Sequence, residues 1–230
     1  CREPRRHHRC RLYRPDIHLM AGEVIGRAAS SLGNSAGWSD NAAAAKVGVR
    51  GELSTAKILN TLAAMPDGPT VMHDLRIPIP GVSANIDHLV ISGRTVTIID
   101  SKVWKPGFYW TLGGRTWRGR ERFAPADKRT IPMAVDAIAG LLHREGVRSR
   151  LARPLLVVWP SNARSAMSLM FLRSPGAAAM SGERFESRVT ALIGLRKADP
   201  KIVEALRGLA ITAPKNSRPA RTVEFGPGEL

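Results

Sequence analysis

Residues 84–102 decide the fold of this chain, and they read ANIDHLVISGRTVTIIDSK. Two runs rich in β-branched residues flank Gly93 and Arg94. Such runs joined by a two-residue turn that contains glycine are typical of a β-hairpin. With Gly93 and Arg94 as the turn, Ser92 pairs with Thr95, and this pair sets the register of both strands. The apolar residues around the turn predict strands that are buried on both faces.

Counting back from the turn places Asp87 directly opposite Asp100, and Asn85 opposite Lys102. Opposed residues share a face with Cβ atoms about 4.5–5.5 Å apart, and like charges at this separation destabilise a sheet unless a cation compensates them. Carboxylate oxygens suit Mg²⁺ or Mn²⁺. Lys102 lies on the same face as Asp100, so its ammonium is placed to bind phosphate or water. The alternative is structural: a protonated Asp87, with Asp100 and Lys102 as a simple ion pair. We prefer the metal site, because buried charge is costly without a partner.

A third carboxylate, Glu52, lies at the expected start of a helix that continues to Ala63. At helical spacing its side chain is in line with Ala56, Leu59 and Ala63, so it faces the core. A glutamate in a first helical turn is equally well explained as a partner of the helix dipole. Since it accompanies the two aspartates, we include Glu52 in the candidate metal site.

The chain is strongly basic, with 35 Lys and Arg residues, 19 Asp and Glu residues and a net charge of +16. This favours a polyanionic partner, first nucleic acid and second an anionic membrane, and a generally basic surface is the third interpretation. Residues 101–130 hold eight basic residues and two acidic ones. The basic residues expected to contact nucleic acid are Lys105, Arg115, Arg118, Arg120 and Arg122.

Residues 107–119 predict a second hairpin with Gly113 and Gly114 as its turn. Counting outward pairs Trp110 with Trp117 across the two strands. A cross-strand pair of this kind is explained by packing within the hairpin. Aromatic residues interleaved with basic ones are equally expected of a surface that stacks nucleic acid. Both interpretations remain open.

Hydrophobic periodicity and turn residues predict the remaining elements. Strands are expected at 70–77 and 154–159, helices at 42–46, 133–143, 183–195 and 200–206, and a loop at 173–182. The helix that precedes the strand at 154–159 implies a parallel crossover.

At 230 residues, the chain is long enough for one domain with extensions. We expect a basic, flexible extension at 1–39, an α/β domain at 40–165, a helical segment packed on it at 166–212 and a polar tail at 213–230.

Cysteine use and hydropathy predict a cytoplasmic protein. Cys1 and Cys10 both lie in the first ten residues, where a disulfide could not hold the core together, so a reducing compartment is expected. No apolar run approaches the ~20 residues needed to cross a bilayer, so no transmembrane segment is expected. Because the sequence does not begin with Met, we expect a fragment or processed form, with Met20 nearer to the natural start.

Three short segments resemble a known family. They are Gly48-Val49-Arg50-Gly51-Glu52, Ile86-Asp87-His88-Leu89-Val90 and Ile99-Asp100-Ser101-Lys102-Val103-Trp104-Lys105-Pro106-Gly107. In their order they resemble the PD-(D/E)XK nuclease superfamily, and more specifically the nuclease-related domain (NERD) family, over about residues 48–159. The resemblance implies a restriction-endonuclease-like α/β fold, in which a mixed β-sheet is flanked by helices.

The resemblance also implies roles for single residues. Glu52, Asp87 and Asp100 would form the acidic metal site, and Lys102 would be the catalytic lysine. Asp100 stands where the family more often has glutamate, which shortens the reach of this carboxylate. The glutamine often found on the following helix has no counterpart at residues 131–143. His88 follows the family's Ile-Asp-His run, but strand alternation points it away from Asp87, so we expect it to be structural.

The function expected from these residues is that of a nuclease dependent on Mg²⁺ or Mn²⁺, which hydrolyses phosphodiester bonds of nucleic acid, first of all DNA. One alternative is a catalytically inactive nucleic-acid-binding module with the same fold. Another is a scaffold or membrane-surface protein whose carboxylates are only structural. Metal dependence would separate the nuclease from both, and salt-dependent DNA affinity would separate the binding module from the scaffold.

Overall fold

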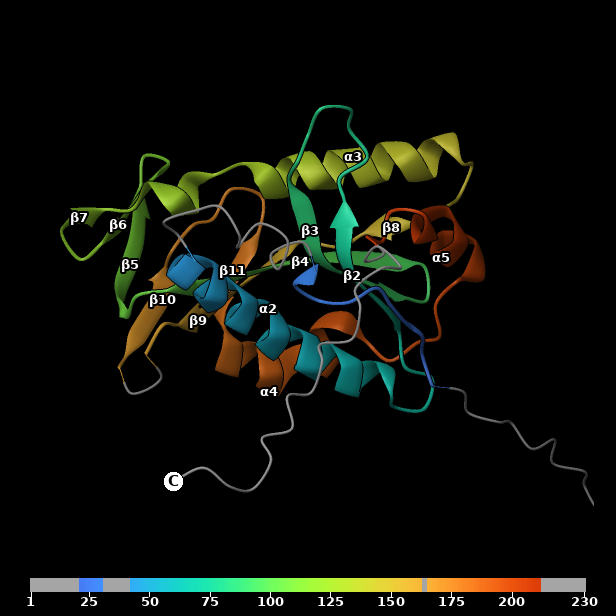
Figure 1. The fold of residues 1–230 in the computed structure, drawn as a ribbon, viewed down its shortest axis with the longest axis horizontal. Coiled ribbons are helices and arrows are strands. Elements are labelled where there is room, and N and C mark those ends of the chain that lie inside the picture. The colour runs from blue at the N-terminus through green and yellow to red at the C-terminus, as the bar shows by residue number, and fades with distance from the viewer. Residues whose placement is uncertain (1–20, 31–41, 163–164, 212–230) are drawn as a thin grey trace, which may run out of the picture.

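The computed structural model describes residues 21–30, 42–162 and 165–211, and a mixed β-sheet forms its centre (Figure 1). The strand order is β1-β2-β3-β4-β9-β11, and β8 also pairs with β4. The strands are β1 (Val24–Ile25), β2 (Thr70–Arg76), β3 (Asn85–Ser92), β4 (Thr95–Trp104), β8 (Arg150–Leu151), β9 (Leu155–Pro160) and β11 (Ala178–Ser181). β2, β3 and β4 are antiparallel neighbours, whereas β9 runs parallel to both β4 and β11. The expected parallel crossover into β9 is therefore confirmed.

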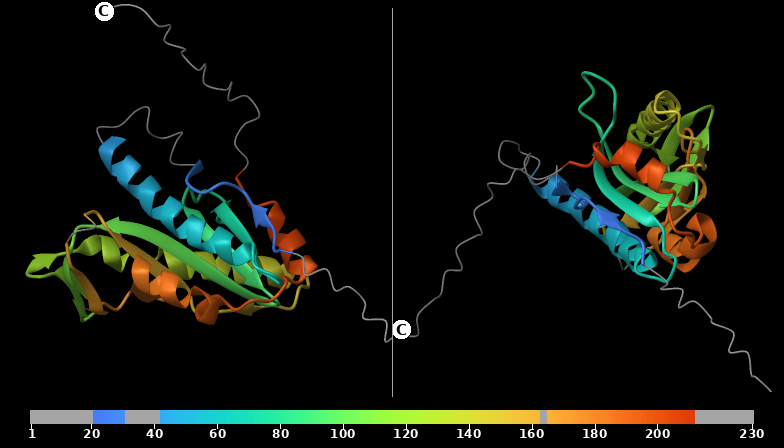
Figure 2. Two further views of the ribbon diagram at one scale, coloured as in Figure 1. Left: turned by 90° about the horizontal axis from the view of Figure 1, so that it is seen from below. Right: turned by 90° about the vertical axis from the view of Figure 1, so that its right-hand side faces the viewer.

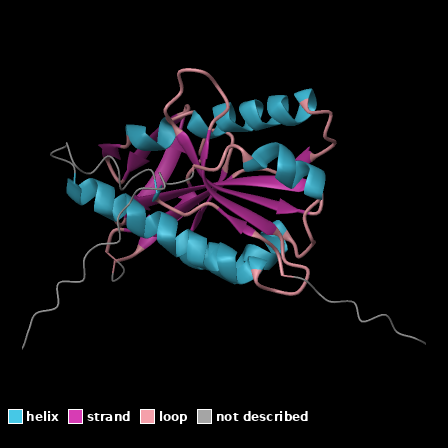
Figure 3. Ribbon diagram, turned by 45° about the vertical axis from the view of Figure 1, so that its right-hand side comes forward, coloured by secondary structure: helices cyan, strands magenta, loops and turns pink. Residues whose placement is uncertain are grey.

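Helices cover both faces of this sheet, which Figure 2 and Figure 3 show lying between two helical layers. The helices are α2 (Ala42–Ala63), α3 (Thr130–Arg144), α4 (Gly182–Ile193) and α5 (Pro200–Arg207). On one face, α2 and α4 pack around Leu59, Leu62 and Phe185. On the other face, α3 and α5 pack around Ile138 and Ile202. The expected α/β class, a mixed sheet flanked by helices, is confirmed.

Helix α2 differs from the expectation because it is one continuous helix from Ala42 to Ala63. Glu52 is consequently in the interior of the helix and not in its first turn, so the helix-dipole explanation of Glu52 is wrong. Gly51 does not interrupt the helix but allows it to lie close to β4. A Cβ atom at Gly51 would be 2.6 Å from Cγ2 of Val103, closer than carbon atoms approach in proteins.

A second, four-stranded sheet follows the end of β4 and lies at the left of Figure 1. Its order is β10 (Met167–Phe171), β5 (Gly107–Leu112), β6 (Arg115–Arg118) and β7 (Glu121–Arg122), and the 3₁₀ helix η1 (Ala124–Asp127) follows β7. Trp110 pairs with Trp117 as expected from the glycine turn. One face of this sheet is closed by Tyr109, which is fully buried and packs against Trp104 and Phe123.

The segments at either end of the expected domain contribute strands that the sequence did not predict. The loop expected at 173–182 contains β11, which pairs with β9 in the central sheet. Residues 21–30 belong to the expected flexible extension, yet β1 pairs with β2 in the structure, so this part of the prediction is wrong. The rest of the expected extension and the tail at 213–230 lie outside the described residues. No helix in the described ranges has both the length and the apolar character needed to span a bilayer.

Candidate active site

The first hairpin has the expected turn register, with Ser92 opposite Thr95, but its two strands separate at the acidic pair. The last paired residues are His88 and Ile99. Beyond this point β4 continues beside β9, and the backbone N–H of Ser101 donates a hydrogen bond of 2.7 Å to Oδ2 of Asp87. The separation places the Asp87 carboxylate where a backbone carbonyl of β3 would otherwise accept the hydrogen bond from Ser101.

The expected pairing of Asn85 with Lys102 is wrong for the same reason. The pairing of β3 with β4 ends before it reaches Asn85 and Lys102. On the opposite edges of the two strands, Asn85 pairs with Arg76 of β2 and Lys102 pairs with Val158 of β9. Counting from the turn cannot predict that the two strands separate at residues 85–87 of β3.

Lys102 joins the two aspartates as an ammonium shared by both carboxylates. Its Nζ lies 2.9 Å from Oδ1 of Asp100 and 3.4 Å from Oδ2 of Asp87. The side chains of Asp87 and Asp100 are 13% and 17% exposed, whereas that of Lys102 is 45% exposed. The first residues of α3, among them Ile131, enclose a space of about 10 Å³ beside the carboxylates, room for about one water. The site is therefore open to solvent through Lys102.

The charge states of these residues depend on one another. Burial and the nearby Asp100 raise the pKa of Asp87 from 3.8 to about 7, although Lys102 and the Ser101 N–H oppose this shift. Burial acts to lower the pKa of Lys102, but the carboxylates of Asp87 and Asp100 outweigh it and raise that pKa above its usual value. At neutral pH Lys102 is therefore a firmly held ammonium and a hydrogen-bond donor.

Glu52 reaches the same group from α2, on the other side of the sheet from α3. It is 9% exposed, and burial followed by the charge of Asp87 raises its pKa from 4.5 to about 8. The attraction of Lys102 partly offsets this shift. The structure thus brings Glu52 into electrostatic contact with the pair to which the sequence assigned it.

Asp74 of β2 is a fourth buried carboxylate, which sequence reasoning missed. It is 2% exposed, its charge is a further cause of the raised pKa of Glu52, and its Oδ1 accepts a 3.2 Å hydrogen bond from Nδ2 of Asn85. Its backbone has a left-handed φ of 51°, which aspartate tolerates better than most residues. The available signal was the pair His73-Asp74, which interrupts an otherwise apolar strand.

The donor set fits a hard divalent cation in its chemistry. Burial and then repulsion by neighbouring carboxylates raise the pKa values of Asp87 and Glu52, and a cation of charge +2 would offset both effects. Within the described residues, however, no three His, Cys, Asp or Glu side chains stand close enough together to form a ready metal-binding cluster. Lys102 takes the position between the two aspartates instead.

Behind the site, two histidines form a buried pair. Nδ1 of His73 lies 2.8 Å from Nδ1 of His88, and Nε2 of His73 lies 2.8 Å from Oδ1 of Asn60 in α2. Burial lowers the pKa of His73 to about 4 and that of His88 well below 6.5, so both imidazoles are neutral at pH 7. His88 points away from Asp87, in agreement with the strand alternation.

Ser101 links this pair to the acidic site. Its Oγ lies 3.2 Å from Nε2 of His88 and donates a 2.8 Å hydrogen bond to Oγ1 of Thr55. Nε1 of Trp159 donates to the same Thr55 hydroxyl at 2.9 Å. Because the side chain of Ser101 is held in this way, its N–H is fixed in the direction of Asp87.

The five basic residues expected to contact nucleic acid fall into two groups. Arg118 forms an ion pair with Glu121, and Arg122 forms one with Asp127. The other three are exposed, and the described part of the chain contains no ion pair to them: Lys105, Arg115 and Arg120. The structure brings none of the five into the acidic site itself.

Comparison with protein families identifies the segment that carries this site. The model of the nuclease-related domain family, NERD, matches residues 47–157. The chain therefore contains a nuclease-related domain. All four candidate site residues lie inside the matched segment. No curated protein and no solved structure matches the chain.

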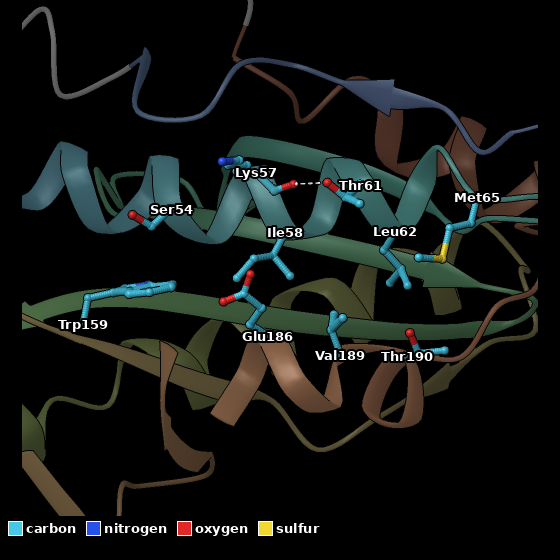
Figure 4. A pocket seen from close by; sticks show the side chains of 10 residues that line it. All are labelled: Ser54, Lys57, Ile58, Thr61, Leu62, Met65, Trp159, Glu186, Val189 and Thr190. Atoms are coloured by element: carbon cyan, nitrogen blue, oxygen red, sulfur yellow. Dashed lines mark hydrogen bonds between the residues drawn. The ribbon is translucent and has the colours of Figure 1, made fainter. Parts of the chain in front are cut away.

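The nuclease-related domain also borders a groove between α2 and α4 of about 420 Å³ (Figure 4). Ile58 and Leu62 of α2 and Val189 of α4 form its apolar wall, and Trp159 closes one end. None of the acidic side chains of the candidate site lines this groove, neither Glu52 nor any of Asp74, Asp87 and Asp100. The groove is therefore separate from the site formed by the carboxylates and Lys102.

Proposed function

We propose that the protein is a divalent-metal-dependent nuclease, which hydrolyses phosphodiester bonds of nucleic acid in the cytoplasm, with DNA as the expected substrate. The observation that carries the proposal is the Lys102 ammonium bound by Asp87 and Asp100 inside a nuclease-related domain. The restriction-endonuclease-like fold implied by the resemblance agrees with this proposal and stays a prediction.

In the proposed site, Asp87, Asp100 and Glu52 hold Mg²⁺ or Mn²⁺. The ion would supply a water of lowered pKa and polarise a phosphoryl oxygen. Asp74 lies close enough to act on the charge of Glu52, so it would add to the negative potential that attracts the ion.

Lys102 and Ser101 would carry the other roles in the proposed reaction. Lys102 cannot act as a base while its pKa is raised, so it would orient the attacking water and donate to the negative charge that develops on the phosphate. The Ser101 N–H keeps Asp87 in place. Hydrolysis joins the water oxygen to phosphorus and breaks one ester P–O bond, which leaves one phosphate end and one hydroxyl end.

A second candidate function is a nucleic-acid-binding module without turnover. It is favoured by the ion pairs of Lys102, which already compensate the two aspartates, and by the small space between the carboxylates and α3. Both functions share the basic surface near the second sheet.

The test is incubation of the full chain with plasmid, linear and single-stranded DNA and with RNA, in Mg²⁺, Mn²⁺ or EDTA. We expect cleavage with metal, none in EDTA, and none by a Lys102→Met variant purified in parallel. Metal-independent cleavage, or cleavage that persists in the variant at the wild-type rate, would refute the proposed mechanism. Tight DNA binding with no cleavage under any condition would support the binding module.

A further inference from the structure

One row of side chains crosses all four strands of the second sheet. Phe171 of β10 pairs with Trp110 of β5, Trp110 pairs with Trp117 of β6, and Trp117 pairs with Arg122 of β7. Residues opposite one another on neighbouring strands share a face. Three aromatic side chains and an arginine therefore form a single line across the sheet.

The rings in this row lie in close contact with one another. Trp110 and Trp117 stack with centroids 4.7 Å apart and planes 14° apart, and the guanidinium of Arg122 lies 5.5 Å above the Trp117 ring. Phe171 meets Phe108 of β5 at 5.9 Å, so Phe108 extends the row. The row is a continuous aromatic surface with a cation at one end.

This aromatic row faces solvent, because the opposite face of the sheet is the one that carries the buried Tyr109. Phe108 and Phe171 are 44% and 52% exposed, and the two tryptophans are half-buried. Large exposed aromatic rings on a folded domain indicate a binding surface.

The charge around the aromatic row indicates which partner would bind this surface. Arg115 begins β6 and Arg120 lies in the turn between β6 and β7. The described part of the chain contains no ion pair to either, so a polyanion would compensate them. Single-stranded nucleic acid offers both phosphates and free base faces, whereas a duplex hides its base faces inside the stack. A four-stranded sheet with aromatic side chains is a known arrangement for stacking two or three bases.

The aromatic row also lies within reach of the candidate active site. Lys102 on β4 and Gly107, where β5 begins, are five positions apart in the sequence. At about 3.3 Å per residue, this distance is at most about 17 Å, which roughly five stacked nucleotides would span. A strand bound on the row could therefore continue to Lys102.

We propose that the aromatic row binds single-stranded nucleic acid by stacking bases on Phe108, Phe171 and the Trp110–Trp117 pair. The binding itself is independent of catalysis. Delivery of the strand to Lys102 rests on the nuclease function proposed above.

The test measures binding of the full chain to a fluorescent oligothymidylate of about 15 nucleotides by anisotropy, in EDTA so that no cleavage is needed. The double variant Phe108→Leu/Phe171→Leu keeps the apolar character but removes both exposed rings. We expect it to bind roughly 5- to 100-fold more weakly, whereas Phe108→Tyr/Phe171→Tyr should bind within a few-fold of wild type. Leu112→Ala is the matched control, since Leu112 is a 67% exposed aliphatic residue on the same hairpin, and it should leave affinity unchanged.

Three further arms settle the nature of the partner. A duplex of the same length should bind more weakly than the single strand and should not distinguish the leucine variant from wild type. An oligouridylate arm tells RNA from DNA, and binding of either supports the proposal. Anionic vesicles that bind the chain through the same phenylalanines, with no oligonucleotide binding, would overturn it.

Equal oligonucleotide affinities of wild type and the leucine variant would also overturn the proposal. Circular dichroism and the tyrosine variant show whether a loss reflects misfolding. Because these assays contain EDTA, they can support binding by the aromatic row even if the chain never cleaves nucleic acid. If the chain cleaves nucleic acid but the leucine variant binds as tightly as wild type, the proposed nuclease function stands and only the proposed binding role of the aromatic row is refuted.

Discussion

Asp87 resists losing its proton because burial and the nearby Asp100 raise its pKa, whereas Lys102 keeps its proton because the two carboxylates outweigh the opposite effect of burial on its pKa. The hydrogen bond from Ser101 holds Asp87 on the side from which Lys102 approaches. The Lys102 ammonium and a hard metal ion would therefore compete for the same two aspartates. Replacing Lys102 is for this reason the way to separate the binding of metal and DNA from catalysis.

The Lys102→Met variant should lose cleavage while its affinity for DNA stays within a few-fold, because this ammonium acts on the attacking water and the transition state. Its affinity for Mn²⁺ should equal or exceed that of the wild type, since the carboxylates lose a competing cation. Nuclease assays and calorimetric titration with Mn²⁺ measure the two effects. Asp87→Ala is the comparison, and it should abolish the heat of metal binding. Equal Mn²⁺ binding by Asp87→Ala and wild type would place the metal elsewhere.

Asp87→Asn should stabilise the metal-free protein at neutral and alkaline pH. Asp87 titrates near 3.8 when unfolded and near 7 when folded, so between these values the folded state binds more protons. The free energy of unfolding of the wild type must then fall as pH rises through this window. Asparagine does not titrate, so the advantage of the variant should grow from about pH 4 to about pH 7 and then stay constant, at a size on the order of 2–4 kcal/mol.

Urea unfolding in EDTA at several pH values measures this effect. Asp136→Asn, at an exposed position on α3, is the matched control and should show no such growth. Addition of Mn²⁺ should stabilise the wild type more than the Asp87 variant. A variant that is less stable than wild type at every pH would show that Asp87 is a structural ion-pair partner and not a strained carboxylate.

At the scale of secondary-structure elements, both hairpins were predictable in register because a two-residue turn and the alternation of strand side chains are local properties. Ser92 faces Thr95 and Trp110 faces Trp117 for this reason. From these counts alone, Asp87, Asp100 and Lys102 could be assigned to one site. The separation of β3 from β4 could not be predicted in this way, since the turn sets the register only as far as His88 and Ile99, where the pairing of the two strands ends.

The remaining errors also come from contacts between distant segments. Gly51 reads as a helix boundary in the sequence, but it is a packing residue against Val103. β11 is short and lies in a loop-like sequence, and it becomes a strand because β9 has a free edge for it. Asp74 could not be assigned to the site because only the fold brings β2 near Glu52.

Gly51 and Gly140 offer a direct test of this account of α2. Alanine in place of an interior helix glycine usually adds about 0.5–1 kcal/mol of stability. Gly140→Ala should show this gain, since its nearest neighbour is the flexible end of Arg144 at 3.4 Å. Gly51→Ala should instead destabilise by about 1–3 kcal/mol, because its methyl group would overlap Val103.

Urea unfolding of both glycine variants and of Gly51→Ala/Val103→Ala measures the contrast. The second substitution removes the colliding atom, so it should recover part of the loss caused by the first. If Gly51→Ala alone were stabilising to the same degree as Gly140→Ala, the close approach of α2 to β4 would be wrong.

At the scale of the whole molecule, the net charge of +16 does not by itself show where a polyanion binds. The ion pairs divide the basic side chains of the second sheet into compensated and uncompensated ones. Arg118 and Arg122 already have acidic partners in Glu121 and Asp127. The exposed Arg115 and Arg120 are then the residues whose charge is available to phosphates.

The salt dependence of single-stranded DNA binding should therefore distinguish two pairs of variants. Each lost phosphate contact reduces the slope of log K against log salt concentration by about 0.7 for a single strand, so Arg115→Ala/Arg120→Ala should reduce it by about 1.4. The matched control Arg118→Ala/Glu121→Ala removes an ion pair without changing the net charge, and it should leave the slope unchanged. Anisotropy titrations over a range of salt concentrations measure both slopes. Equal reductions in the two variants would mean that the Arg118–Glu121 ion pair opens on binding. No reduction in either variant would place the phosphate contacts outside strands β5–β7.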